Sequence, residues 1–372
     1  MTEEDQVAEK ETVLVLEARY DAELLQRRMR EVLDTFPLEL EGKDVLVKPN
    51  MLGPWPGESA IITHPMFVRA LVDVLKERGA RVQVGDNPGL RGYGRVEKVW
   101  KITGLQELLG GDLVNLSASP RSVPIASRFL DFTSISSQVH DCDILISVPK
   151  FKTHVSTIIT GAVKNSFGFL VGGEKARMHA LAPRFRDFGE LMVDIYQLRV
   201  PDLVIMDAIT VMEGNGPSCE DIRDAGKMLA ARNGIALDTV MAAMMGIDPA
   251  KVPLLVTAGE RNLGPVRVDD IDVQGHFEKI DGFKQPSTVP RMAWTAPIQG
   301  LMFKLVSRHA LRADPERCTA CRTCEKSCPA GAIEVKQTPQ FDSGKCIDCY
   351  CCYELCPEHA IILNRFIRFL QR

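Results

Sequence analysis

The chain has 372 residues, 45% of them hydrophobic, which is enough to bury a large core and to form two domains. Its net charge of −4 gives no reason to expect a nucleic acid or an anionic surface as the main partner. The acidic start, Met1–Asp5, is unlike a signal peptide, and no uncharged apolar run approaches the length of a membrane span. We therefore expect a cytoplasmic protein without a transmembrane segment.

Short aliphatic runs alternate with amphipathic stretches from about Thr12 to Gly275, a pattern typical of an α/β fold. Because the runs are continuously apolar, we expect a mostly parallel sheet with helices on both faces. The expected strands lie at residues 13–16, 44–47, 81–84, 143–148, 203–206 and 254–256. The expected helices lie at residues 21–35, 67–76, 156–168 and 238–245.

Polar residues follow four of these strands directly. In open α/β sheets, ligands bind beyond the carboxyl ends of the strands, so these residues are expected to face one cleft. They are Lys48, Asn50, Asp86, Asn87, Lys150, Lys152, His154 and Asp207. The lysines indicate an anionic ligand, either a carboxylate or a phosphate. The alternative is that they are solvated or pair with nearby acidic residues.

The helix expected after His154 would begin at Ser156 as its N-cap and end at Gly168, with its positive end toward the same cleft. The loop Met212–Pro217, which contains Glu213 and Asn215, is a second candidate wall, since its glycines permit close approach of the backbone to a ligand. Asp238 either caps the next helix or belongs to the site.

A proline-containing linker near Gly282–Pro297 separates this part from the C-terminus, and apolar residues then recur at helical spacing from Ile298 to Val306. The last residues, 365–372, mix apolar and arginine side chains. Both segments can contact a membrane surface or pack the C-terminal module against the main domain or a second subunit. We favour the packing.

The C-terminal module contains two C-x2-C-x2-C-x3-C-P runs, the pattern that holds 4Fe-4S clusters in bacterial-type ferredoxins. Three closely spaced thiolates reach one side of a cubane cluster, and the fourth ligand comes from the opposite run. Cluster one is thus assigned Cys318, Cys321, Cys324 and Cys356, and cluster two Cys346, Cys349, Cys352 and Cys328. Residues 332–335 and 360–363 look like matched short strands, and Cys351 is surplus to this register.

Two other uses of these cysteines fit less well. A disulfide framework is typical of small secreted chains, and structural zinc prefers other spacings of Cys and His. The remaining cysteines, Cys142 and Cys219, stand alone and are expected to be inert buried thiols.

Several motifs together resemble the domain of unknown function 362 family. They are Val47–Asn50, Gly85–Gly89, Ser147–His154, Gly161–Asn165, Glu213–Pro217 and Asp238. The resemblance covers about Val13 to Asp248 and implies a role for Lys164 and Asn165 beside the strand-end residues. Many family members carry a C-terminal two-cluster ferredoxin module, as here. Residues 218–220 depart from the expected glycine after Gly216-Pro217. At greater distance, the domain is similar to the N-terminal domain of lactate racemase-like enzymes, without that group's cofactor-attachment residues.

These observations lead to one functional hypothesis and one alternative. Two 4Fe-4S clusters in residues 313–372 would pass electrons from a low-potential donor protein, across a linker at 282–312, to a small anion in the α/β domain, 1–281. There Lys48, Lys150, Lys152 and Lys164 would neutralise the anion, and His154 would move protons. The alternative is a non-catalytic electron carrier or maturation partner that docks on a larger redox enzyme. Either form is compatible with a homo-oligomer.

Overall fold

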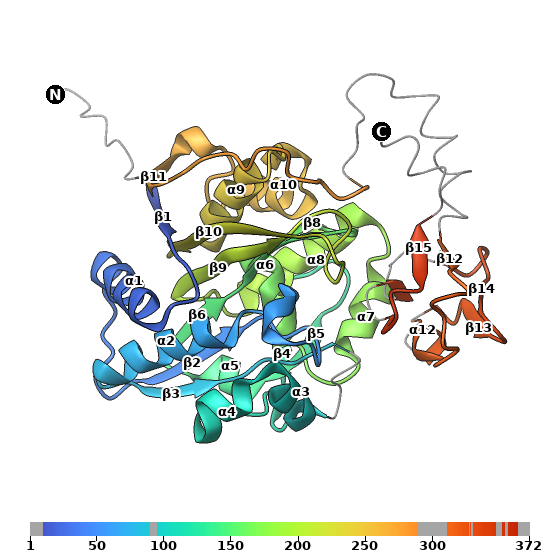
Figure 1. Ribbon diagram of the computed structural model, residues 1–372, viewed down its shortest axis with the longest axis horizontal. Coiled ribbons are helices and arrows are strands. Elements are labelled where there is room, and N and C mark those ends of the chain that lie inside the picture. The colour runs from blue at the N-terminus through green and yellow to red at the C-terminus, as the bar shows by residue number, and fades with distance from the viewer. Residues whose placement is uncertain are drawn as a thin grey trace.

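The computed structural model describes residues 10–89, 95–288, 311–326, 328, 330–346, 352–353 and 356–363 (Figure 1). The helix expected at 298–306, the basic and apolar end at 365–372, and the residues Cys349 and Cys351 lie outside this range. Among the described residues, no helix combines the length and the apolarity that crossing a bilayer requires.

A large mixed sheet forms the centre of the α/β part, with the order β11-β1-β10-β9-β6-β2-β3 and with β7 and β8 attached beside β9. Its strands are β1 (Glu11–Glu17), β2 (Asp44–Pro49), β3 (Arg81–Val84), β6 (Ile144–Val148), β7 (Lys150–His154), β8 (Ile158–Thr160), β9 (Leu203–Met212), β10 (Ile222–Ala231) and β11 (Ile271–Gly275). The pairs β2–β3, β2–β6, β6–β9, β7–β9 and β1–β11 are parallel, and β1–β10, β9–β10 and β7–β8 are antiparallel. The expected mostly parallel α/β sheet is confirmed.

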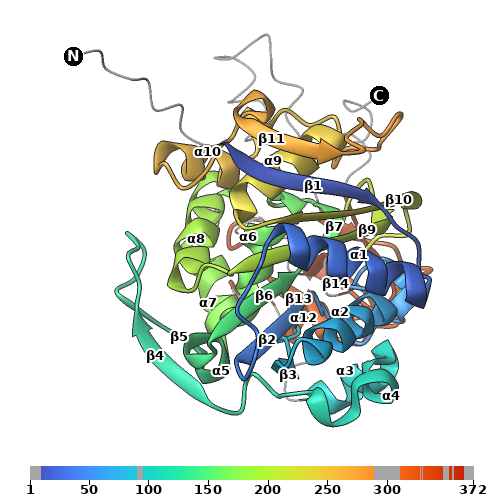
Figure 2. The ribbon, with the colours of Figure 1, turned by 90° about the vertical axis from the view of Figure 1, so that its left-hand side faces the viewer.

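Helices cover both faces of this sheet (Figure 2). The helices are α1 (Ala22–Thr35), α2 (Pro65–Glu77), α3 (Val96–Thr103), α4 (Leu105–Leu109), α5 (Ser137–Asp141), α6 (Ala162–Asn165), α7 (Glu174–Leu181), α8 (Phe185–Leu198), α9 (Gly234–Met244) and α10 (Pro253–Glu260). Alternate residues of β1 face opposite cores: Val13 and Val15 pack with the α8–α10 side, and Leu14 and Leu16 pack with α1 and α2. The sheet is therefore buried on both sides, as its apolar runs predicted.

Three expected elements differ in the structure. Residues 254–256 belong to helix α10, because Pro253 starts a helix rather than a strand. The helix expected to begin at Ser156 is replaced by the β7–β8 hairpin, whose β-branched run Thr157–Thr160 favours extended backbone, so α6 begins only at Ala162. Helix α9 begins at Gly234 with Asn233 as its cap, whose Oδ1 accepts from the N–H groups of Ile235 and Ala236. Asp238 is thus not the N-cap of its own helix.

Two smaller sheets build the C-terminal module around the short helix α12 (Thr323–Lys326). Strand β13 (Ile333–Val335) pairs with β14 (Pro339–Phe341), and β15 (Ile361–Leu363) pairs with β12 (Leu311–Ala313). Both strands expected after the cysteine runs are confirmed, and each pairs with a strand that the sequence analysis did not identify. A further hairpin, β4 (Pro120–Pro124) with β5 (Phe132–Ser136), projects from the α/β part (Figure 2).

Candidate functional site

Four cysteines from both ends of the module line one hollow of about 310 Å³. They are Cys318, Cys321, Cys324 and Cys356. Cys318 and Cys321 lie in one loop, where Ala320 and Arg322 have positive φ angles of 51° and 59° that curl the chain around the hollow, and Cys324 lies in the helix α12 that follows. The fourth arrives from the opposite cysteine run, as expected for the remote ligand of a cubane cluster. These residues fit the assignment of cluster one.

Backbone N–H groups point at the sulfur atoms of both remote cysteines. The N–H of Ala332 donates to Cys328 Sγ at 3.2 Å, and the N–H of Ala360 donates to Cys356 Sγ at 3.2 Å. Hydrogen bonds of this kind stabilise the thiolate form and tune the potential of a bound cluster. The second set of cysteines includes Cys346 and the buried Cys352, while Cys349 lies outside the described residues.

A cavity of about 1020 Å³, including the solvent-open space at its mouth, lies at the carboxyl ends of β2 and β3. Six of the residues expected at the site line it: Asn50, Asp86, Asn87, Lys152, Lys164 and Asn165. Parallel β2 and β3 end side by side, which brings residues that are about 35 positions apart in the chain to one rim. The rest of the wall is largely apolar and includes Met51, Leu52 and Pro217.

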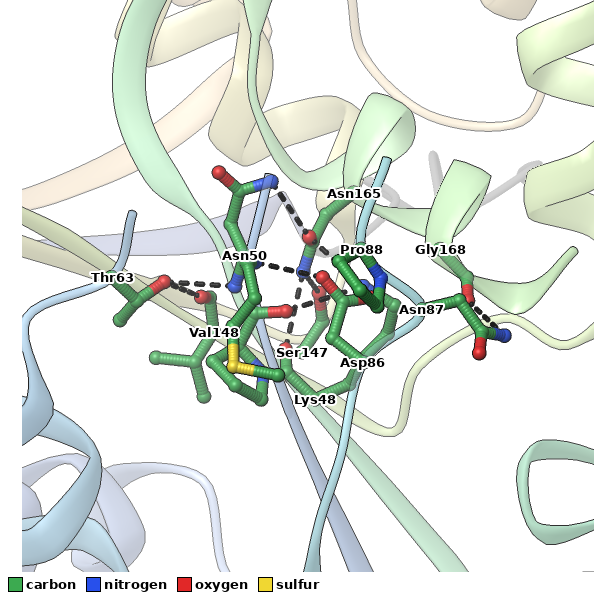
Figure 3. Close-up of polar contacts among 12 residues, drawn as sticks. Lys48, Asn50, Thr63, Asp86, Asn87, Pro88, Ser147, Val148, Asn165 and Gly168 are labelled. Carbon is green, nitrogen blue, oxygen red and sulfur yellow. Dashed lines mark hydrogen bonds and ion pairs between the residues drawn. The ribbon is translucent and has the colours of Figure 1, made fainter. Parts of the chain in front are cut away.

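Lys48 lies behind this rim rather than in it, and it is only 1% exposed (Figure 3). Its Nζ lies 2.7 Å from Asp86 Oδ1 and donates to Asn165 Oδ1 at 3.0 Å. Burial lowers the pKa of Lys48, and the Asp86 carboxylate opposes that shift. A Cβ at Gly168 would lie 2.0 Å from Asp86 Oδ1, so only glycine fits beside this pair. Lys48 thus holds Asp86 and Asn165 in place.

Side-chain and backbone groups fix the loop after β2 as well. Thr63 Oγ1 accepts from the N–H of Asn50 at 2.9 Å, and Asp86 Oδ2 accepts from the N–H of Met51 at 2.7 Å (Figure 3). Lys152 reaches the cavity from β7 and donates to Asn50 Oδ1 at 2.7 Å and to the carbonyl of Ile61 at 2.6 Å. The polar rim is therefore rigidly held by hydrogen bonds between distant segments.

Among the residues of the cavity wall that the sequence analysis missed are Phe167, Lys175 and His179. The ammonium groups of Lys164 and Lys175 lie over the Phe167 ring, at 5.7 and 5.8 Å from its centroid. Lys175 also donates to the carbonyl oxygens of Asn87 and Pro88. Burial, with Lys48 and Lys164 nearby, lowers the pKa of Lys175 to about 8 despite the opposing charge of Asp86. The sequence feature that could have pointed to Lys175 is the glycine pair 172–173 just before it, where the chain turns into α7.

Lys150 and Asp207 do not line this cavity but form a separate buried pair. Their side chains are fully buried, and Lys150 Nζ lies 2.7 Å from Asp207 Oδ2. Tyr20 donates to the same carboxylate at 3.0 Å, and its ring stacks on His64 with centroids 3.8 Å apart. Lys150 lies opposite Asp207 of β9, and the pairing of β7 with β9 shifts register before Lys152, which lies opposite Met212. Lys152 reaches the cavity and Lys150 does not. Burial lowers the pKa of Lys150, opposed by Asp207.

His154 is also buried outside the cavity lining. Its Nδ1 accepts from the N–H groups of Ser156 at 3.0 Å and Thr157 at 3.3 Å, so the imidazole organises the β7–β8 turn. The turn takes the place of the helix start that was expected to present His154 to the cleft. His154 therefore stabilises the hairpin rather than contacting a ligand in the cavity.

Glu213 and Asn215 hold the loop that follows β9 and do not line the cavity. The carboxylate of Glu213 pairs with Arg223 at 3.1 Å and accepts from the N–H of Lys284 at 3.1 Å. Asn215 Oδ1 accepts from the N–H of Ser287 at 2.8 Å. Pro217, two residues on, does line the cavity.

Asp238 caps a helix other than its own. Its carboxylate accepts from the N–H groups of Ala162 at 2.6 Å and Val163 at 3.0 Å, at the start of α6. Those N–H groups are therefore engaged and do not face the cavity, contrary to the expectation for this helix. A Cβ at Gly161 would lie 1.9 Å from Asp238 Oδ1. Burial raises the pKa of Asp238 to about 7 although both N–H groups act against the shift.

The cysteine module contacts the walls of the cavity domain at three places. Tyr353 Oη donates to the carbonyl of Asn215 at 2.8 Å. The His359 ring stacks on Trp55 with centroids 5.5 Å apart. Leu311 and Tyr353 pack with Val155 and Phe185 of the α/β part. The module thus lies against the segments that carry the cavity lining, beside α7 (Figure 1).

Comparison with known proteins finds a match in each part of the chain. Two family models match: Domain of unknown function (DUF362) over residues 45–243, and 4Fe-4S dicluster domain over residues 310–357. The chain is 31% identical over 253 residues to "Thylakoid-associated protein sll1697" of Synechocystis sp., and the match covers 67% of this chain and 78% of that protein. A solved structure with some similarity is the lactate racemase apoprotein from Thermoanaerobacterium thermosaccharolyticum. It has a TM-score of 0.40 and 12% identity over 64% of this chain and 58% of the racemase.

These matches support two statements. The dicluster match, with the cysteine-lined hollow, makes the C-terminal module an iron–sulfur module with a role in electron transfer. The first match covers more than half of the chain, and the cyanobacterial relative exceeds 30% identity over two thirds of it. The chain belongs to the DUF362 family.

Proposed function

We propose that this protein holds two 4Fe-4S clusters and passes electrons from a low-potential donor protein to a small anionic ligand in the cavity of its α/β domain. Bound clusters of this type supply one electron at a time. Cluster one would be held by Cys318, Cys321, Cys324 and Cys356, and cluster two by Cys346, Cys349, Cys352 and Cys328.

The observation that carries the proposal is the contact of both cysteine runs with segments of the cavity wall. Tyr353 follows Cys352 directly, and its hydroxyl binds Asn215, two residues before the lining residue Pro217. His359 follows Cys356 by three residues and stacks on Trp55, three residues after the lining residue Leu52. A small anion in the cavity would therefore lie close to both segments of the module that carry the cluster-binding cysteines.

The lysines of the cavity would neutralise the ligand as it accepts electrons, and two of them are held in place by hydrogen bonds. Asn50 orients Lys152, and the carbonyls of residues 87 and 88 orient Lys175. With a pKa of about 8, Lys175 can release or take up a proton near neutral pH, which suits a reduction that consumes protons. Lys150 and His154, first expected to act on the ligand, would instead stabilise the walls.

A second candidate function, an electron carrier that docks on a larger redox enzyme, is favoured by one observation: Cys321 is exposed. Cluster one would then lie close enough to the surface to exchange electrons with a partner protein. The thylakoid association in the relative's name supports a donor or acceptor located at a membrane. We propose that the protein itself is located in the reducing environment of the cytoplasm.

The test is anaerobic purification with counts of iron and acid-labile sulfide, followed by stopped-flow oxidation of the dithionite-reduced protein by small carboxylates and phosphate esters that carry a reducible carbonyl group, which takes up two electrons and two protons to become an alcohol. The proposal expects about eight irons per chain and an anion that speeds oxidation in the wild type. It also expects slower oxidation in Tyr353→Phe, with unchanged iron content and an unchanged rate of reduction by dithionite. A count near four irons contradicts the second cluster. Oxidation by a partner protein, with no response to any anion, supports the carrier instead.

A further inference from the structure

The cavity carries more positive than negative charge. Lys152, Lys164 and Lys175 line it, and Asp86 is the one carboxylate among the described lining residues. That carboxylate is itself within 2.7 Å of the Lys48 ammonium, which lies behind the rim. Its negative charge is therefore shared with a fourth lysine. Several ammonium groups held in a partly desolvated space favour a ligand with more than one negative charge.

Two of these charges converge on a single side chain. Lys164 comes from α6 and Lys175 from α7, and both ammonium groups lie within 6 Å of the Phe167 ring centroid. Two neighbouring ammonium groups repel each other, which makes the charged form of each less favourable. An anion bound between them would offset this repulsion. The pKa of Lys175 is lowered mainly by burial, and the like charges of Lys48 and Lys164 add to this effect.

We propose that the cavity binds a dianion, a phosphate monoester or a dicarboxylate, through the ammonium groups of Lys164 and Lys175. The apolar remainder of such a ligand would lie against Met51, Leu52 and the Phe167 ring, which form the less polar part of the wall. The cavity thus offers both charged and apolar walls, as a metabolite with an anionic head group and an apolar body requires. This inference rests on the proposed function and narrows its ligand from any small anion to a doubly charged one.

The proposal is tested by calorimetry on the oxidised full-length protein at low salt, with inorganic phosphate, succinate and acetate as probes. Phosphate or succinate is expected to bind at least about tenfold more tightly than acetate, since a charge-assisted hydrogen bond is worth about 1.5–3 kcal/mol. Saturation by phosphate alone assigns a phosphate ester, and saturation by succinate alone assigns a dicarboxylate. Binding of the three probes with equal affinity, or of none, overturns the proposal.

Variants locate the binding. Lys175→Met is expected to weaken binding of the dianion about tenfold to a hundredfold, and Lys175→Arg is expected to restore most of it. Arg177→Gln is the matched control, because Arg177 lies on the same helix but pairs with Glu174 at the surface. Circular dichroism confirms that each variant is folded, and Lys164→Met gives an independent second substitution. Wild-type affinity in both lysine variants contradicts the assignment.

The pH dependence of sulfate binding gives a further check, because sulfate stays doubly charged throughout. Asp86 faces the Lys175 ammonium as a carboxylate, Lys48 and Lys164 face it as like charges, and His179 shares the cavity. A bound dianion raises the pKa of Lys175, so sulfate affinity should be full below pH 8 and fall above it. In Lys175→Met, sulfate affinity should no longer decrease above pH 8. If the pH profile of this variant matched that of the wild type, Lys175 would not be part of the binding site.

Failure of this inference can be told apart from failure of the proposed function. Binding is measured without an electron donor, so it does not depend on the clusters. If dianions fail to bind while a monoanion still oxidises the reduced protein, the function stands and only the ligand class is wrong. If phosphate binds but iron counts show no clusters, the dianion site stands and the proposed electron transfer is wrong.

Discussion

Replacing Lys150 by methionine should destabilise the protein rather than act on its ligand. The substitution keeps the length of the side chain but removes the ammonium group that lies 2.7 Å from Asp207, where both side chains are fully buried. The carboxylate would keep the Tyr20 hydroxyl at 3.0 Å and the N–H groups of His64 at 2.9 Å and Ile209 at 3.2 Å. Its charge would have no cation beside it in a medium of low polarity.

Removal of one partner from a buried ion pair costs about 3–5 kcal/mol. For a domain of this size, each kcal/mol lowers the melting temperature by roughly 2–4 °C, so we expect a fall on the order of 10 °C. Anaerobic thermal unfolding followed by circular dichroism measures this fall. The double variant Lys150→Met with Asp207→Asn should regain much of the loss, because it removes the orphaned charge and keeps an acceptor for the His64 N–H.

The control is Lys101→Met on the surface of α3, which should leave the melting temperature within about 1 °C, since exposed substitutions change stability by less than about 0.5 kcal/mol. If Lys150→Met melted like the wild type and yet lost anion-dependent oxidation, a structural role for this lysine would be refuted. The original expectation of a catalytic Lys150 would then return.

Three further predictions follow from contacts in the two parts. Gly161→Ala should lower the melting temperature, since its Cβ would meet the Asp238 carboxylate at 1.9 Å, whereas Gly111→Ala, with nothing within 4 Å, should not. Burial raises the pKa of Asp238 to about 7, above its value of about 4 in the unfolded chain, so its stabilising contribution is complete below pH 4 and is lost as pH rises through 7. That loss, on the order of 4 kcal/mol, should be absent from pH-dependent denaturation of Asp238→Asn. Electron paramagnetic resonance of reduced Cys356→Ala should lack the signal of cluster one, and that of Cys328→Ala should lack the signal of the other; loss of the same signal in both would contradict the crossed ligands.

The sequence predicted those parts of the fold in which local pattern and burial agree. Helices α1 and α2 were predicted nearly to their ends, because an apolar stripe coincides with capping residues such as Asp21. Residues 254–256 have the same aliphatic character as a strand but belong to α10, since short apolar runs do not distinguish a buried strand from a buried helix. Strand β10 was missed because half of it is partly exposed and polar.

The candidate site shows a similar division. Residues directly beyond β2 and β3 reach the cavity, since parallel neighbours end at one edge of a sheet. Lys150 and His154 were misplaced because the chain continues as strand β7 after Pro149, and the pairing of β7 with β9 shifts register between Lys150 and Lys152. Regular alternation would place Lys150, Lys152 and His154 on one face of the strand. Only Lys152 of that segment lines the cavity. Lys175 was missed because the glycine pair 172–173 marks a turn but does not show that α7 folds back over Asn87.

The pairing of β12 with β15 bears on how the protein is made. Leu311 lies opposite Leu363, so the first strand of the module finds its partner only in the last described residues. The hollow formed by residues 318–324 likewise needs Cys356 to be complete. During synthesis the α/β domain can fold as it emerges, but the iron–sulfur module cannot be completed until strand β15 has been translated. A chain cut short within the second cysteine run would retain the cavity and lack both the closing strand and the fourth sulfur.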